Sequence, residues 1–339
     1  MFELDKLVRK NITNLKPYSS ARKDFTGKEG VFLDANENPF GSLNRYPDPL
    51  QNELKQKLSA LKSVAVDNIF IGNGSDEVID LAFRIFCNPG KDKALTFFPT
   101  YGMYEVSASI NDVELIQLPL NSNFQIDFNS FLSYIKDVNI KMVFICSPNN
   151  PTANIIKDIE KVLDNFNGIV IVDEAYIDFS EAYSLISKID KYPNLIVSQT
   201  LSKAWAMASI RVGIAYANKS IIDYYNNVKP PYNISQLNQK AAISAIDDIK
   251  EYETRKKLII SEKKKLEVEL EKINCITKIY PSDANFILVE TTDASLVYSK
   301  LVEQKIIVRN RSSMVNNTVR ITVGSPEENI KLLESLKRI

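Results

Sequence analysis

Between residues 69 and 217, short apolar runs rich in Ile, Val and Phe alternate with segments that have helical periodicity. Parallel strands must be joined by crossover segments, usually helices, so this alternation predicts an α/β domain built on a mostly parallel sheet. Ligands of such sheets gather at the carboxyl ends of the strands, where a site is therefore expected. The predicted strands are residues 69–71, 94–98, 113–118, 141–146, 168–172, 195–198 and 212–217.

The two ends of the chain have a different pattern. Residues 4–15 predict a short amphipathic helix, residues 31–33 a short strand, and Asp48-Pro49 the start of a helix with a leucine stripe. After residue 230 we expect one long charged helix near 245–273, followed by short strands at 276–280, 286–289, 306–308 and 319–323. Ser325 and Glu328 predict a capping box for the last helix. The predicted division is an N-terminal arm and helix (1–30), a large α/β domain (31–230) and a small C-terminal α+β domain (231–339).

Composition excludes several classes of function. The 339 residues carry 42 Lys+Arg and 42 Asp+Glu, so no net charge favours nucleic acid or an anionic membrane. The chain has no histidine, which removes serine–histidine triads, histidine bases and most zinc sites. Its three cysteines, Cys87, Cys146 and Cys275, form no CxxC pair, so no metal centre or disulfide framework is expected. With neither a signal-peptide layout nor a membrane-length apolar run, we expect a soluble cytoplasmic protein.

A single lysine, Lys203, follows the apolar run 195–197 in the stretch SQTLSKAW. A lysine beside a buried strand is unusual, because its charge loses water there, and a neutral lysine amine is the nucleophile for imine formation with a carbonyl. Thr200, Ser202 and Arg211 add two hydroxyls and a permanent cation, which suit a phosphate. An imine-forming lysine beside a phosphate site suggests pyridoxal phosphate. The stretch alone is also compatible with an ordinary surface loop.

Two further strand ends carry polar side chains. Gly72-Asn73-Gly74 leads into Ser75 and Asp76 at a helix start, which suits either an anion or a plain helix cap. Asn150 follows one strand in SPNNPT, and Asp173 ends another in VDEAY, three residues before Tyr176. A carboxylate at a strand end can hold a pyridine nitrogen protonated, and an amide and a phenol can bind a ring hydroxyl.

Tyr101 follows a strand in FPTYGMY and could stack on a flat cofactor. In chain order, GNGSDE, FPTYGMY, SPNNPT, VDEAY, TLSKAW and IRVG resemble the motifs of pyridoxal-phosphate-dependent aminotransferases of fold type I. DANENPFG, RYPDP, PYSSAR and the ending IIVRN…VRITVGSPEEN look like the histidinol-phosphate aminotransferases of that class. The resemblance runs from residue 4 to residue 335.

The resemblance implies the fold type I architecture, pyridoxal 5'-phosphate as cofactor, and a homodimer with shared active sites. It implies transfer of the amino group of L-histidinol phosphate to 2-oxoglutarate, in histidine biosynthesis. An aromatic-amino-acid aminotransferase, a threonine-phosphate decarboxylase and a decarboxylase of another phosphorylated amine stay open as alternatives. A ligand-sensing domain of a transcription regulator is disfavoured, because residues 1–30 are too short and not basic enough for a DNA-binding module.

The family's site residues carry over position by position. Lys203 would bond to the cofactor and then move the substrate proton. Asp173 would bind the ring nitrogen, Asn150 and Tyr176 the ring hydroxyl, and Tyr101 the ring face. The remaining positions implied by the resemblance are Ser75, Asp76, Thr200, Ser202 and Arg211 at the cofactor phosphate, Tyr46 reaching that phosphate from the neighbouring subunit, and Arg320, Arg309, Tyr18 and Asn36 around the substrate. The chain departs from the pattern at Ala153, where the family usually has glycine, and at Ala208-Ser209 before IRVG.

Overall fold

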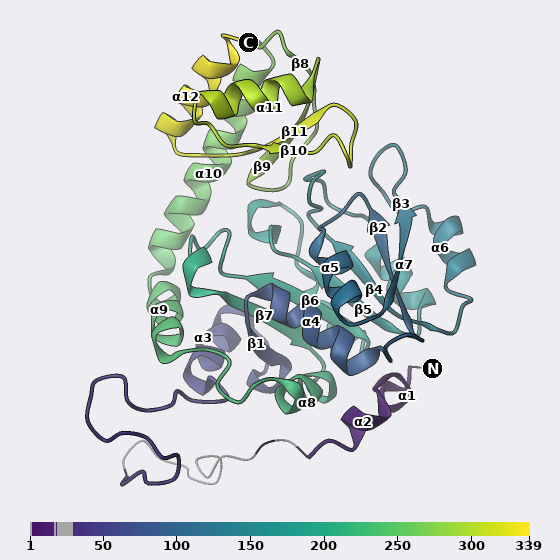
Figure 1. Ribbon diagram of the computed structural model, residues 1–339, viewed down its shortest axis with the longest axis vertical. Helices are drawn as coiled ribbons and strands as arrows, with labels where there is room; N and C mark the ends of the chain where they lie inside the picture. Colours follow the sequence, from purple (N-terminus) through teal and green to yellow (C-terminus); the bar gives the residue numbers. More distant parts are fainter. Residues whose placement is uncertain (1, 17, 19–29) are drawn as a thin grey trace.

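The computed structural model describes residues 2–16, 18 and 30–339, and contains a large and a small β-sheet arranged along the long axis of the molecule (Figure 1). The large sheet has the strand order β1-β7-β6-β5-β4-β2-β3. Within this sheet, β7 runs opposite to the other six strands. Residues 201–211 are too few for a crossover helix between β6 and β7, so these two strands pair antiparallel. The predicted mostly parallel sheet is confirmed. Its strands are β1 (Ile69–Asn73), β2 (Lys93–Phe98), β3 (Glu114–Pro119), β4 (Ile140–Cys146), β5 (Ile169–Asp173), β6 (Leu195–Thr200) and β7 (Val212–Ala217).

Helices cover both faces of the large sheet, so its central strands are buried on two sides. Along β5, Val170 and Val172 belong to one hydrophobic core, while Ile169 and Ile171 belong to another on the opposite face. A strand between two cores reads as a continuous apolar run, which is why the sequence pattern was so clear. The helices of this part are α3 (Asn52–Lys62), α4 (Ser75–Phe86), α5 (Met103–Ile110), α6 (Phe128–Tyr134), α7 (Ile159–Asn165), α8 (Lys219–Val228) and α9 (Gln236–Asp247).

The small sheet is antiparallel, in the order β10-β11-β9-β8, and α10 (Ile249–Leu270) leads to it from the large sheet (Figure 1). On β11, Val319 and Ile321 face a third hydrophobic core, and the alternation of a strand turns Arg320 to the opposite face. Ser325 and Glu328 form the predicted capping box. The elements are β8 (Ile276–Ile279), β9 (Phe286–Thr291), α11 (Ala294–Glu303), β10 (Arg309–Asn310), β11 (Thr318–Thr322) and α12 (Pro326–Leu336).

Two predicted helices are each divided in the structure. The segment 4–15 forms α1 (Leu4–Leu7) and α2 (Lys10–Thr13), because the backbone is extended at Val8, whose side chain is buried in the core below. The predicted helix 245–273 is interrupted at Asp248. This residue ends α9, and its carboxylate accepts a hydrogen bond from the Glu251 amide, so it also caps α10.

Three predictions of secondary structure were wrong: one helix start, one strand that does not form and one strand position. Asp48 accepts a hydrogen bond of 2.7 Å from the Asn52 amide, so it closes a turn ahead of α3 and is not the cap of a helix starting at Pro49. Residues 31–33 form no strand, and Val31 is 88% exposed. The pairing predicted at 306–308 occurs at β10 instead. Among the described residues, no helix could span a membrane, and no cluster of acidic and cysteine side chains could hold a metal.

Candidate active site

The predicted lysine, aspartate, asparagine and tyrosine meet at the carboxyl ends of β4, β5 and β6. Asp173 is the last residue of β5, while Asn150 and Lys203 lie in the loops that follow β4 and β6. The Nζ of Lys203 lies 5.6 Å from the centre of the Tyr176 ring. The Asn150 amide donates to the Tyr176 hydroxyl over 3.4 Å. The structure therefore brings four of the predicted site residues into one cluster.

Asp173 is a buried carboxylate with two hydrogen-bond donors. Tyr104 donates its hydroxyl proton to Oδ2 over 3.0 Å, and the Ala175 amide donates to Oδ1 over 3.1 Å. Burial raises the pKa of Asp173 to about 6, although these two donors and the nearby Lys203 favour the charged form. Such a carboxylate is ready to accept a positively charged N–H from a ring nitrogen.

Lys203 and Tyr176 have pKa values that suit proton transfer and hydrogen-bond donation, respectively. Burial lowers the pKa of the Lys203 amine, and the positive charge of Arg320 lowers it further, while Asp173 acts in the opposite direction. Burial raises the pKa of the Tyr176 hydroxyl, so this group keeps its proton. A lysine whose ammonium form is destabilised is a better nucleophile and a more balanced general base.

The N-terminus of α4 and Arg211 form a cationic cradle. Arg211 has left-handed backbone angles (φ +51°), and its guanidinium lies 3.5 Å from a carboxylate oxygen of Asp76. A Cβ on Gly74 would stand 2.6 Å from Arg211 Nη2, and one on Gly213 would stand 2.2 Å from the amide nitrogen of Ser75. Both glycines therefore allow Arg211 and β7 to approach a helix N-terminus, which is itself suited to an anion.

The other predicted phosphate and ring contacts surround this cradle. The Thr200 hydroxyl, at the end of β6, lies 2.9 Å from the Ser202 hydroxyl and accepts from the Ser202 amide. Tyr101 donates its hydroxyl to Asp76 over 3.2 Å, which orients its ring beside the Asp173 cluster. The structure thus brings the predicted phosphate contacts and Tyr101 together from three separate loops.

The small sheet supplies cations to the same cluster. Arg320 donates to Oδ1 of Asn150, and its guanidinium carbon lies 5.1 Å from the centre of the Phe286 ring. Arg309 is the register partner of Arg320 on the neighbouring strand. Tyr176, after β5 of the large sheet, also packs edge-on against Phe286 of the small sheet, so the two sheets approach each other at the predicted site.

Three predicted residues lie away from this cluster. Tyr46 stacks on Tyr232 with ring centres 4.4 Å apart, and it lines a surface cavity of about 470 Å³ together with Asn36. Tyr18 is 71% exposed. The loop of residues 30–46, which carries Asn36 and Tyr46, projects from the body of the molecule at the lower left of Figure 1. The roles predicted for Tyr18, Asn36 and Tyr46 stay predictions.

Sequence reasoning missed two residues that support the site. Tyr104 donates to Asp173 and lies three positions after Tyr101. Residues three apart lie on the same side of a helix, so this spacing in FPTYGMY could have indicated that both tyrosines face the site. Asn149 accepts from the Thr100 hydroxyl and donates to the Pro99 carbonyl, which ties the loop after β4 to the loop after β2.

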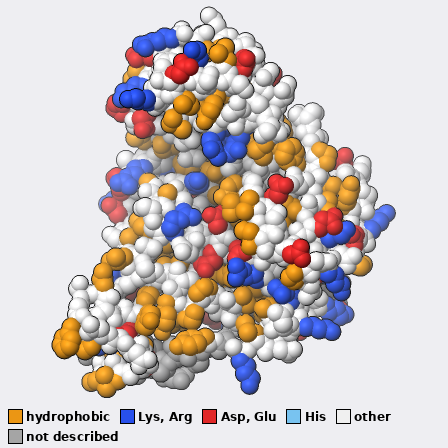
Figure 2. Space-filling view, in the orientation of Figure 1, with side chains coloured by type: hydrophobic (Ala, Val, Ile, Leu, Met, Phe, Trp, Pro, Cys, Tyr) orange, Lys and Arg blue, Asp and Glu red, His pale blue; other side chains and the backbone are white. Residues whose placement is uncertain are grey.

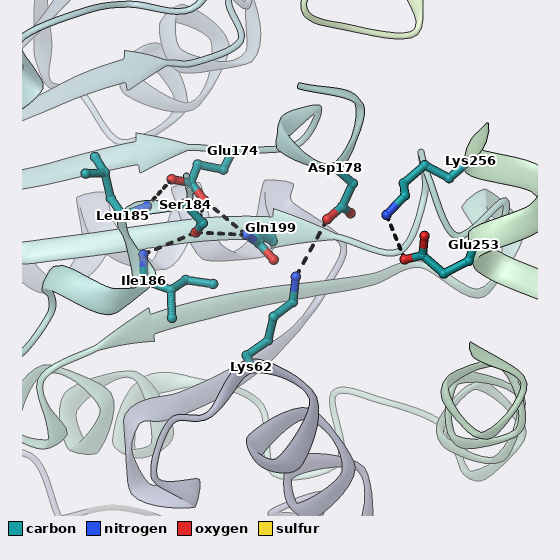
Figure 3. Close-up of polar contacts among 9 residues, drawn as sticks. All are labelled: Lys62, Glu174, Asp178, Ser184, Leu185, Ile186, Gln199, Glu253 and Lys256. Atoms are coloured by element: carbon teal, nitrogen blue, oxygen red, sulfur yellow. Dashed lines mark hydrogen bonds and ion pairs between the residues drawn. The ribbon is translucent and has the colours of Figure 1, made fainter. Parts of the chain in front are cut away.

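Glu174, next to Asp173, serves a different purpose (Figure 3). Its buried carboxylate accepts from the Ser184 hydroxyl, the Leu185 amide at 2.7 Å and the Gln199 amide at 3.0 Å. These bonds fix the loop between β5 and β6 to the sheet. Of the two acids in VDEAY, only Asp173 contacts the site cluster.

Comparison with known proteins agrees with this geometry. The family model for aminotransferase class I and II matches residues 23–336. The histidinol-phosphate aminotransferases of Cytophaga hutchinsonii and Bacteroides thetaiotaomicron are each 50% identical, covering 99% and 100% of this chain and 99% of each relative. The crystal structure of the histidinol-phosphate aminotransferase from Clostridium acetobutylicum superposes with a TM-score of 0.80 at 28% identity, over 87% of this chain and 90% of that one.

A second solved structure, the Sinorhizobium meliloti histidinol-phosphate aminotransferase in complex with pyridoxal-5'-phosphate, has the same fold, with a TM-score of 0.79 at 21% identity over 87% of this chain and 82% of that one. The fold agrees with the fold type I prediction. The chain belongs to the class I and II aminotransferases and, by its half-identical full-length relatives, to the histidinol-phosphate aminotransferases among them.

Proposed function

We propose that the chain transfers the amino group of L-histidinol phosphate to 2-oxoglutarate, yielding imidazole acetol phosphate and glutamate. The observation that supports this most directly is the position of the Lys203 amine. It lies 5.6 Å from the centre of the Tyr176 ring, and the charges of the buried Asp173 carboxylate and the Arg320 guanidinium both act on it. This arrangement combines an amine, an acid for a ring nitrogen and a cation for an anionic substrate.

The residues present fit pyridoxal 5'-phosphate. When bound, this cofactor supplies an aldehyde that accepts an amino group and a ring that withdraws electrons from the substrate carbon. Asp173 would pair with the ring nitrogen, Asn150 and Tyr176 would bind the ring hydroxyl, and Tyr101 would cover the ring. The cradle opened by Gly74 and Gly213 supports the assignment of the phosphate to Ser75, Asp76, Thr200, Ser202 and Arg211.

Lys203 has two tasks in this proposal. It would hold the cofactor through its neutral amine, the form that burial and the charge of Arg320 favour. With substrate bound, the same Nζ would be free to take the proton from the substrate carbon and to return it as the amino group is transferred. Asp173 would keep the ring nitrogen protonated by pairing its negative charge with it.

Arg320 and Arg309 would bind the anionic end of the substrate, and Tyr18 and Asn36 would complete that side. Arg320 is oriented by Asn150 and Phe286, so it presents a fixed fork toward the substrate. Both substrates of the proposed reaction carry anionic groups. Binding each in turn at one site predicts ping-pong kinetics.

We propose a homodimer in which Tyr46 reaches the cofactor phosphate of the neighbouring subunit. Apolar side chains of the projecting segment support this, since Val31, Leu33, Phe40 and Leu43 are all more than 60% exposed. Figure 2 shows hydrophobic side chains gathered at this lower end of the molecule. An exposed apolar surface of this kind is typical of a protein interface. Mixing Tyr46→Ala and Lys203→Ala proteins should restore activity, because each hybrid dimer would contain one complete site.

The remaining expectations are also proposals. We propose the cytoplasm as the location, which is supported by three buried cysteines that form no disulfide. We propose domains at 31–230 and 231–339 preceded by an arm at 1–30. The separate hydrophobic core around β9, β11 and α12 supports the second boundary.

The test of the proposed reaction is a substrate comparison with the purified holoenzyme. We expect histidinol phosphate to change the absorbance of the bound cofactor and to yield glutamate when 2-oxoglutarate is added. Tyrosine, phenylalanine and phosphothreonine should produce little change. Release of carbon dioxide from a phosphorylated amino acid, without formation of glutamate, would instead identify a decarboxylase.

A further inference from the structure

A third arginine lies on the same sheet face as the two predicted substrate arginines. The Arg311 amide donates to the Thr318 carbonyl over 2.9 Å, which extends the β10–β11 pairing by one residue beyond Asn310. Alternate residues of paired strands lie on one face, so Arg309 and Arg311 share the face of Arg320. The opposite face, with Val319 and Ile321, is covered by α11 and α12.

This face of the small sheet is directed toward the active site. Phe286 of β9 lies on it and packs into the core of the large sheet, against Tyr176. Arg320, in the centre of the face, binds Asn150. Burial lowers the pKa of the Arg311 guanidinium, the charges of Arg320 and Arg309 lower it further, and Tyr176 acts in the opposite direction, so Arg311 lies close enough to interact with these groups.

The charge of these arginines is not neutralised within the described part of the chain. None of Arg309, Arg311 and Arg320 forms an ion pair with a described carboxylate. The one acid among the described residues of β9–β11 on this face, Glu290, accepts from the Tyr280 hydroxyl. The Nε atoms of Arg311 and Arg320 are buried and have no hydrogen-bond partner.

Buried guanidinium donors without an acceptor are costly, and three like charges on one face repel one another. An anion between them would remove both costs. A carboxylate needs one bidentate arginine, whereas a phosphate monoester carries up to two charges and offers three acceptor oxygens.

We propose that Arg311 is a substrate-binding residue that contacts the phosphate of the amino donor and discriminates it from a carboxylate. The proposal rests on the proposed function for the identity of the donor. Arg320 donates to Asn150 within the site cluster, and its charge acts on the Lys203 amine. Arg311, two residue pairs further along the sheet and opposite Thr318, meets the more distant phosphate oxygens.

The test compares Arg311→Gln with Arg311→Lys, and with Lys300→Gln as a control on the exposed face of α11. With histidinol phosphate, we expect Arg311→Gln to raise KM by about tenfold or more and to change kcat little, because a charge-assisted hydrogen bond is lost. Arg311→Lys should recover part of this loss. The KM for glutamate in the reverse direction should change by less than about threefold, and Lys300→Gln should behave like the unchanged protein.

A binding measurement separates this proposal from the proposed reaction. Inorganic phosphate should bind the holoenzyme about tenfold more weakly after Arg311→Gln, whichever phosphorylated amine is the true donor. An unchanged affinity for phosphate, or an equal loss with glutamate, would overturn the role of Arg311. If the unchanged protein binds phosphate but does not turn over histidinol phosphate, the proposed reaction fails and the role of Arg311 is still decided.

Discussion

The hydroxyl of Tyr104 donates a 3.0 Å hydrogen bond to Oδ2 of Asp173, and this pair links the first turn of α5 to the end of β5. The Tyr104 ring is fully buried and stacks on Phe144 with ring centres 4.9 Å apart. The hydroxyl therefore has little freedom to move, and it holds the carboxylate in one orientation. Asp173 can then meet a ring nitrogen without a further loss of conformational freedom.

Tyr104→Phe should weaken cofactor binding without removing it. Loss of the hydroxyl leaves the Asp173 carboxylate less oriented and raises its pKa further, and we expect an affinity loss of about three- to tenfold. Equilibrium titration with pyridoxal phosphate measures this. Tyr216→Phe is a matched control, because the buried hydroxyl of Tyr216 has no partner, and its affinity should be unchanged. Equal effects of the two substitutions would contradict the role of Tyr104.

The buried charge of Asp173 should make the stability of the cofactor-free protein depend on pH. Its pKa of about 6 lies above the ordinary value of 3.8, so the folded protein binds the proton more tightly than the unfolded chain. Stability is therefore lost as pH rises from about 4 through 6. Asp173→Asn removes this loss. Its free energy of unfolding should exceed that of the unchanged protein by about 3 kcal/mol at pH 7.5, and the difference should vanish near pH 4. Denaturant unfolding at several pH values tests this; an advantage independent of pH would refute it.

Gly213→Ala should disrupt the phosphate cradle. The added methyl group would collide with the backbone of Gly74 and Ser75 at 2.2–2.3 Å, so β7 and the start of α4 must separate. We expect at least a tenfold weaker affinity for pyridoxal phosphate and a lower melting temperature. Gly102→Ala is the control, since nothing lies within 4 Å of its added methyl group. Retained affinity in Gly213→Ala would show that the close approach is not needed.

Glu174→Ala should affect stability more than chemistry. The substitution leaves the donors of Ser184, Leu185 and Gln199 without their acceptor, and we expect a loss of about 3 kcal/mol in the free energy of unfolding (Figure 3). The protein that remains folded should bind cofactor normally. Glu181→Ala, at an exposed position of the same loop, should change stability by less than about 0.5 kcal/mol. Loss of cofactor binding in folded Glu174→Ala would contradict the assignment of a structural role to Glu174 and a cofactor-binding role to Asp173.

The large sheet was predictable because its central strands are buried on both faces and read as unbroken apolar runs. The positions of Asp173, Asn150 and Lys203 followed from the rule that polar residues after such strands meet at one edge. The division of the long helix at Asp248 was not predictable from periodicity. The apolar and charged pattern continues through that residue, and its side-chain cap is decided by local geometry.

Contacts between distant segments were the least accessible from the sequence. No spacing indicates that Arg320 binds Asn150, because these residues are 170 positions apart, one in a loop after a strand of the large sheet and the other in the small sheet. The segment 31–33 has the composition of a strand but finds no partner strand among the described residues. The side chains of Val31 and Leu33 are exposed in one copy of the chain, and a second copy could cover them.

The most direct test of the account is to identify the residue that bonds to the cofactor. Holoenzyme treated with borohydride, digested and analysed by mass spectrometry should carry the reduced cofactor on the peptide that contains Lys203, and on no other lysine. Lys203→Ala protein should bind pyridoxal phosphate without covalent labelling and without turnover. A label on a different lysine, or full activity in Lys203→Ala, would contradict the central role of this amine.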